Sequence, residues 1–270
     1  MRRIKQAMVA LSMYAIEKNL LAGGKVVHAP TKKMGGTLLP RFLLIHYTAG
    51  ASFDADVRTL STDPVQASVH IVIGRGGELT QIVPLNRVAW HAGESRWGNL
   101  NGMNQHTIGI ELSNAGLVKK DVAGEFRTWW GAKIPQAEVI EAHHERGGPL
   151  VGWHTYTSEP IETLLEVARV LHARFNFLDI LGHDDVSWPR KTDPGPAFPM
   201  GSLKSRVIGR SGYVERRYDV HNHVFPFTDA SRWRSRRFSI TGYAADDGSV
   251  SDKSIRRWAG TMQLWISGRY

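Results

Sequence analysis

The sequence predicts an α/β domain built on a mixed β-sheet. Short apolar runs that are typical of buried strands alternate with helical segments over residues 42–182. Two of these runs are joined by a glycine-rich turn, which makes them an antiparallel hairpin. The 270 residues are enough for one sizeable core, or for one core and a small further module.

Five strands are expected in this domain, each rich in β-branched and other apolar residues. They cover residues 42–46, 69–73, 78–83, 108–112 and 178–181. The sequence Gly-Arg-Gly-Gly at residues 74–77 forms the turn of the hairpin.

Two helices are expected. Pro160 begins the stronger one, which extends to about Phe175, because its apolar residues fall on one face at helical spacing. A second helix is expected over residues 135–146, with Pro135 in its first turn and two glycines after its end. Residues 117–134 are expected to be a loop insertion.

Residues 1–25 are expected to be an N-terminal extension. Three basic residues precede a mostly apolar stretch over residues 7–16, as in a short signal peptide. Polar residues interrupt this stretch and no clear cleavage site follows, so an amphipathic helix within residues 1–20 is favoured, and a cytoplasmic location is favoured over export. No run reaches about 18 apolar residues, so no transmembrane segment is expected.

The charge of the chain is concentrated in its C-terminal part. The formal net charge is +9, from 34 basic and 25 acidic residues, and residues 205–270 contribute 12 − 6 = +6 of it. A basic tail favours an anionic polymer as partner, such as nucleic acid, a membrane surface or the bacterial wall. No nucleic-acid-binding motif accompanies the charge, so nucleic acid is not expected. The absence of cysteine excludes disulfides and thiolate chemistry.

Two histidines and an aspartate are candidate metal ligands. His46 ends one buried strand, His183 follows another, and Asp193 lies ten residues later. Two imidazoles and one carboxylate suit zinc, and three protein ligands leave the fourth position open for water. On spacing alone, however, a histidine at a strand end is more often a hydrogen-bonded structural residue.

Two more residues are candidates for catalysis. Glu111 interrupts an apolar strand, where burial would raise its pKa into the range of a general base. Lys191 lies two residues before Asp193, where its ammonium could stabilise an oxyanion. The alternatives are a carboxylate on the solvent face of an edge strand and a solvated loop lysine.

Seven motifs that follow one another along the chain favour the metal-binding and catalytic interpretations over the structural ones. They are residues 44–50, 67–70, 77–84, 89–93, 108–112, 182–185 and 190–198. Together they resemble the zinc-dependent N-acetylmuramoyl-L-alanine amidase family of the second type, which is related to peptidoglycan recognition proteins. The resemblance covers residues 26–208 and implies a central mixed β-sheet flanked by helices, with zinc in a surface groove.

The resemblance also implies roles for the five candidates. His46, His183 and Asp193 match the family's zinc ligands, Glu111 its general base, and Lys191 its transition-state-stabilising lysine. The implied reaction cleaves the amide between N-acetylmuramic acid and L-alanine, in intact peptidoglycan or in soluble muropeptides. The alternative is a non-catalytic peptidoglycan-binding protein, although such relatives tend to lose a ligand that this chain keeps.

Several positions depart from the family or remain open. Val69 stands where many relatives have tyrosine, Tyr47 follows the first ligand, and residues 186–189 differ from the usual loop. Residues 209–270 form the basic tail, and the stretch 265–270 resembles the closing strand of a bacterial SH3-like wall-binding module. A basic extension packed on the amidase is the alternative.

Three further pairs of aromatic residues also have interpretations from the sequence. The pair Trp129 and Trp130 is interpreted as an anchor of the insertion rather than a sugar-stacking platform. His143 and His144 are expected at the surface. Trp90 and His91 either border the groove or pack in the core.

Overall fold

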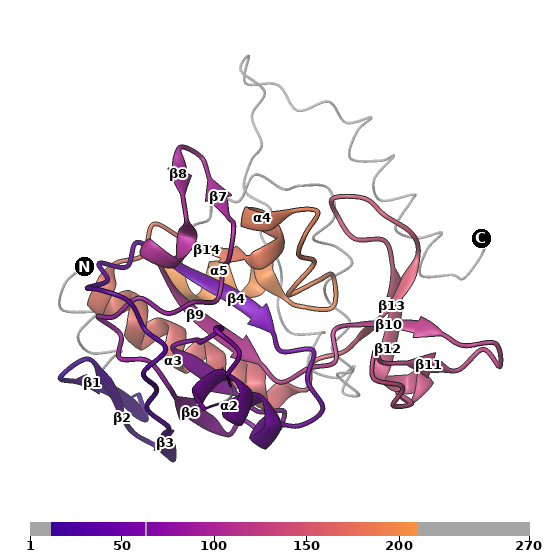
Figure 1. Cartoon of the computed structure of the whole chain (residues 1–270), viewed down its shortest axis with the longest axis horizontal. Coiled ribbons are helices and arrows are strands. Elements are labelled where there is room, and N and C mark those ends of the chain that lie inside the picture. The colour runs from indigo at the N-terminus through magenta and orange to yellow at the C-terminus, as the bar shows by residue number, and fades with distance from the viewer. Residues whose placement is uncertain (1–11, 63, 210–270) are drawn as a thin grey trace, which may run out of the picture. The chain divides into compact units, whose positions relative to one another are not determined.

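The structure is a computed structural model that describes residues 12–62 and 64–209 (Figure 1). The predictions for the basic tail, including its SH3-like stretch, lie outside these residues apart from Gly209. No helix in the described part of the chain is long and apolar enough to cross a membrane.

A six-stranded mixed sheet forms the centre of the described domain. Its strand order is β14-β4-β9-β5-β6-β3. The bounds are Asp179–Gly182, Phe42–Tyr47, Thr107–Leu112, Ile71–Ile73, Leu79–Gln81 and Val26–His28, respectively. Strands β14, β4, β9 and β5 are parallel, β6 is antiparallel to β5, and β3 is parallel to β6. The mixed sheet and its hairpin are therefore confirmed, although β5 is shorter than expected.

The middle of the sheet is buried on both faces. Leu43, Leu44 and Ile45 of β4 have no solvent exposure, which is why this strand is a continuous apolar run. Helix α2 (Phe53–Ser61) packs Phe53 and Val57 against the cluster that contains Val69 and Val72. The parallel arrangement brings the carboxyl ends of β14, β4 and β9 to one edge.

Helix α3 (Ser158–Phe175) confirms the stronger helix prediction. Its buried residues are Pro160, Ile161, Leu164, Leu165, Val167, Ala168, Val170 and Leu171. Asn176 ends the helix in the left-handed conformation at φ 54° and donates its backbone N–H to the His172 carbonyl. Two shorter helices that the periodicity did not predict follow in the chain, α4 (His183–Ser187) and α5 (Met200–Ile208).

A second, antiparallel sheet corrects two predictions. Its order is β11-β10-β13-β12, and the bounds are Phe126–Arg127, Leu117–Lys120, Val151–His154 and Val139–Ala142. Residues 117–134 are therefore not simply a loop insertion. Residues 135–146 are not a helix, since Pro135 precedes only the short 3-10 turn η2 (Gln136–Glu138). Val139–Ala142 instead pairs with β13, a long-range contact that the local pattern does not encode.

The N-terminal prediction is also wrong where the structure tests it. Strands β1 (Tyr14–Glu17) and β2 (Leu20–Gly23) form an antiparallel hairpin in place of a helix. Lys18 and Asn19 both have positive φ, 49° and 67°, which matches the twist of a two-residue hairpin turn. The hairpin is held to the main sheet, because the Leu21 N–H donates to Oε1 of Gln81 at 2.6 Å. Short strands β7 (Arg96–Trp97) and β8 (Leu100–Asn101) form a further hairpin.

Candidate metal centre

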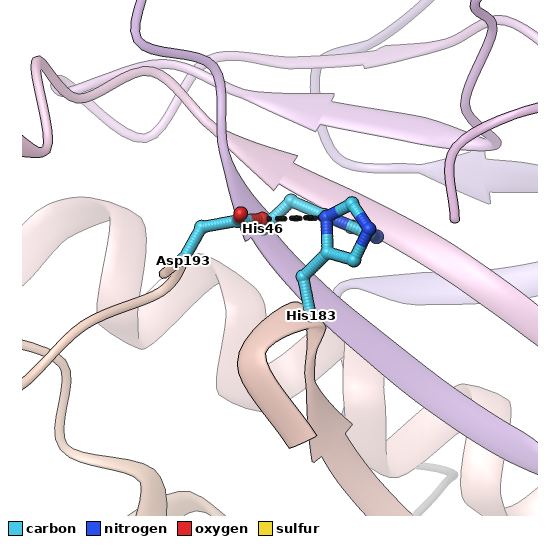
Figure 2. A group of neighbouring side chains, drawn as sticks. All are labelled: His46, His183 and Asp193. Carbon is cyan, nitrogen blue, oxygen red and sulfur yellow. Dashed lines mark hydrogen bonds and ion pairs between the residues drawn. The ribbon is translucent and has the colours of Figure 1, made fainter. Parts of the chain in front are cut away.

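The three predicted ligands meet at the carboxyl edge of the parallel strands (Figure 2). His46 is the fifth residue of β4, and His183 is the first residue of α4, directly after β14. Because β4 and β14 are adjacent and parallel, both imidazoles leave the sheet at the same place. Asp193 is brought back by the following segment, in which its carbonyl accepts from the backbone N–H of Asp184.

The donor atoms form a nearly equilateral triangle. Oδ2 of Asp193 lies 2.9 Å from Nδ1 of His46 and 3.0 Å from Nδ1 of His183, and the two Nδ1 atoms are 2.9 Å apart. All three side chains are buried. Two donors on a tetrahedral zinc ion are about 3.3 Å apart, so the triangle is of the right size for such an ion.

The protonation of the triangle also fits a cation. Nε2 of His183 lies 3.0 Å from the carbonyl oxygen of Ala92, which can only accept, so the ring proton is on Nε2. Nδ1 of His183 then directs a lone pair at the carboxylate of Asp193. Two acceptors that face each other inside the protein are stabilised by a cation between them, and the donor set is one that zinc prefers.

The pKa values of His46 and Asp193 favour metal binding. Burial, and then the charge of His183, lower the pKa of His46 to about 4, so its ring is neutral at pH 7. Burial opposes ionisation of Asp193, but the neighbouring His183 and His46 rings outweigh it and hold its pKa below the usual range. A metal at this site would therefore displace few protons at neutral pH.

Glu111 lies beside the triangle with an unpaired oxygen. It is the register partner of His46 on the neighbouring strand β9, which lies inside the sheet and not at its edge. Its Oε2 is buried and has no hydrogen-bond partner among the described residues. Burial, followed by the charges of Asp193 and Asp56, raises the pKa of Glu111 well above its ordinary value, while Lys191 opposes this. The edge-strand alternative is thus excluded, and a raised pKa is the property expected of a general base.

A cleft of about 490 Å³ opens onto the site. Its lining comprises Gln66, Ala67, Trp90, His91, Gly93, Asn104, His183, Arg190 and Lys191. The charge of Lys191 lowers the pKa of both His46 and Glu111, which places its ammonium near both groups. Trp90 and His91 are among the lining residues, so they border the cleft as one of the two sequence interpretations expects. Burial lowers the pKa of His91 well below its ordinary value, so this ring is neutral.

Two of the departures from the family pattern have structural positions near the site. The hydroxyl of Tyr47 lies 3.1 Å from Oγ1 of Thr192, and burial raises the pKa of Tyr47 to about 12. This tyrosine therefore stays protonated at physiological pH. Val69 is fully buried in the cluster under α2.

His144 corrects the prediction that both residues of its pair lie at the surface. His143 is exposed, but His144 is 5% exposed, and its Nε2 lies 3.0 Å from Oδ2 of Asp184. Its ring stacks on Trp188 with centroids 4.4 Å apart. The local sequence pattern does not reveal this burial, because the partners lie about 40 residues along the chain. His144 thereby braces the start of α4, where His183 lies.

The two neighbouring tryptophans have different environments. Trp130 packs against the cluster of Ala115, Val118, Phe126 and Val139, as an anchor would. Trp129 is 78% exposed, and its Nε1 donates to the carbonyl of Ala49 at 2.8 Å. The anchor interpretation therefore holds for Trp130 alone.

The chain is similar to known proteins in both sequence and fold. A sequence model of the N-acetylmuramoyl-L-alanine amidase family matches residues 36–196. N-acetylmuramoyl-L-alanine amidase AmiD of Escherichia coli K12 is 30% identical over 190 residues, which are 66% of this chain and 58% of AmiD. The 1,6-anhydro-N-acetylmuramyl-L-alanine amidase AmpD of the same strain is 29% identical over 145 residues, 53% of this chain and 60% of AmpD. A crystal structure of a Se-Met AmpD derivative has the same fold, with a TM-score of 0.51 and 22% identity over 71% of this chain and 98% of that chain.

Proposed function

Because this chain belongs to the N-acetylmuramoyl-L-alanine amidase family, we propose that it hydrolyses the amide between N-acetylmuramic acid and L-alanine in peptidoglycan or muropeptides. The chain spans 58% of the length of AmiD, so the activity and the substrate are inferred for its matching part. We assign the amidase domain to residues 26–208.

The observation that carries the proposal is the buried triangle with Glu111 beside it. A triangle of two imidazoles and one carboxylate provides three ligands, and the adjoining cleft gives water and substrate access to a fourth position. A binding protein would have no use for a carboxyl at that place with one buried oxygen that lacks a partner among the described residues. The arrangement therefore favours hydrolysis over the non-catalytic alternative.

We assign the chemistry to this chain's residues as follows. Zinc, when bound, supplies a Lewis acid and lowers the pKa of its water to about 7. Glu111 takes a proton from the attacking water and returns it to the leaving nitrogen of L-alanine. The ammonium of Lys191 neutralises charge that develops on the carbonyl oxygen. His46, His183 and Asp193 would hold the ion.

The proposed reaction is tested by mass spectrometry of its products. Zinc-loaded protein is incubated in parallel with intact sacculi and with purified anhydro-muropeptides. We expect free stem peptides that begin with L-alanine, together with the matching sugar that has lost its peptide. AmpD is named for an anhydro-muramyl substrate and AmiD for the muramyl amide, so both arms are informative. Binding to either material without release of peptide would support the non-catalytic alternative.

We further propose that the basic tail attaches the enzyme to the anionic wall. The charge of residues 209–270, 11 − 6 = +5, supports this, because a second binding site raises the local concentration of enzyme on an insoluble polymer. A protein that ends at Gly209 should keep its rate on a soluble muropeptide and lose binding to sacculi. The loss should be largest at low salt, since exposed charges are screened as ionic strength rises.

Sedimentation with sacculi at two salt concentrations measures this effect, and circular dichroism of the shortened protein is the control for folding. Unchanged sedimentation would mean that the tail is no anchor. Unfolding of the shortened protein would mean that the domain extends beyond residue 208.

A further inference from the structure

His91 lies between the metal ligand His46 and the buried Thr107. Nδ1 of His91 is 3.0 Å from Nε2 of His46, on the side of that ring opposite the triangle. Nε2 of His91 is 3.4 Å from Oγ1 of Thr107. The three side chains thus form a continuous line from the core to the metal centre.

The hydrogen bonds along this line of side chains all run one way, from His46 to His91 and from His91 to Thr107. The hydroxyl of Thr107 donates to the carbonyl of Met103 at 2.7 Å, which uses its only proton. Its oxygen can then only accept, so His91 donates from Nε2 and keeps a lone pair on Nδ1. This lone pair accepts the Nε2 proton of His46. Nδ1 of His46 is thereby left unprotonated where it faces His183 and Asp193.

We propose that His91 is a positioning residue that fixes the tautomer and orientation of His46 for metal binding. The inference rests on the proposed function only in requiring a metal at the triangle. The neighbouring backbone does the same for the second imidazole, because the Ala92 carbonyl accepts from Nε2 of His183. One short segment, His91 and Ala92, therefore orients both imidazole ligands.

The place of the His91 ring is built into the fold. A Cβ at Gly109 would lie 2.5 Å from Nδ1 of His91, so the ring fits only because residue 109 has no side chain. The backbone is held as well, since Oδ1 of Asn104 accepts from the N–H groups of His91 at 3.0 Å and Ala92 at 2.8 Å. The ring thus occupies one fixed position against β9.

Two substitutions separate positioning from packing. His91→Leu fills much of the space but removes the acceptor, whereas His91→Asn keeps an oxygen acceptor near the position of Nδ1. Zinc affinity of the full chain is measured by competition with a chromophoric chelator. We expect His91→Leu to weaken zinc binding by about 10- to 100-fold and His91→Asn to recover most of the loss.

His70 provides a matched control. It is also a fully buried imidazole, donating to the Arg87 carbonyl and accepting from the Gly109 N–H, but it makes no hydrogen bond to a ligand. His70→Leu should lower the melting temperature and leave zinc affinity unchanged. Wild-type affinity in His91→Leu, or an equal loss in His70→Leu, would overturn the proposal. Wild-type protein that binds no zinc would instead overturn the metal site itself.

Nitrogen-15 spectra of the histidine side chains test the same inference on the zinc-loaded wild-type protein. The spectra show which ring nitrogen carries the proton in the wild-type protein, so they test the proposal even if His91→Leu does not fold. We expect the ring proton on Nε2 in both His46 and His91. A proton on Nδ1 of His91 contradicts the direction of the line and would overturn the proposal.

Discussion

Alanine in place of His46, His183 or Asp193 is expected to abolish hydrolysis and zinc binding together. The three donor atoms lie within 3.0 Å of one another and form the described ligand triangle, so each substitution leaves only two protein ligands. Catalytic zinc sites ordinarily use three. Metal content by mass spectrometry and release of L-alanine peptides should therefore fall in parallel in all three variants.

A histidine outside the site provides the control for this series. His154 on β13 is also buried, and its ring contacts Glu138 and the backbone of Ala115. His154→Ala should keep its zinc and its activity, even if the free energy of unfolding falls. Full activity after rigorous removal of metal from the wild-type protein would contradict the metal mechanism.

Glu111→Gln is expected to keep zinc and substrate binding while kcat falls by roughly 10²- to 10⁴-fold. Glutamine has nearly the same shape, but it cannot accept the proton of the attacking water. The carboxyl has a raised pKa and a buried oxygen without a described partner, as expected of a group that handles protons. Rates at saturating substrate, together with zinc content, measure the effect.

Glu166 on α3 is a matched control for Glu111. Its Oε2 is likewise buried without a partner among the described residues, but it belongs to a helix outside the ligand set. Glu166→Gln should therefore leave kcat unchanged. If Glu111→Gln lost its zinc, Glu111 would be a ligand or a support of the ligands and not the general base.

The parts of the fold that hold the site could be predicted because their signals are local. Strand β4 is a continuous apolar run that ends in His46, and α3 repeats its apolar residues at helical spacing. The second sheet could not be predicted in this way. Its strand Val139–Ala142 is fixed by pairing with Val151–His154, and a window of a few residues does not contain that partner.

In the candidate site, too, some features have local sequence signals and others depend on distant contacts. His46, His183 and Asp193 could be found from residue type and motif, and the structure brings them together. The orientation of the imidazoles could not be found, because one acceptor is the backbone carbonyl of Ala92, which every residue type has. His91 was noticed in the sequence, but its role depends on the ring position that Gly109 permits.

The ligand triangle joins distant parts of the chain, and this couples the metal to the lifetime of the folded protein. His46 lies 137 residues from His183 and 147 from Asp193, so the unfolded chain has no comparable binding site. An ion that binds only the native state stabilises it by mass action, by about 2.7 kcal/mol at a free concentration of 100 times Kd. Starvation for the ion would thus deplete the enzyme twice, first by emptying its site and then by enlarging the unfolded population that proteases degrade.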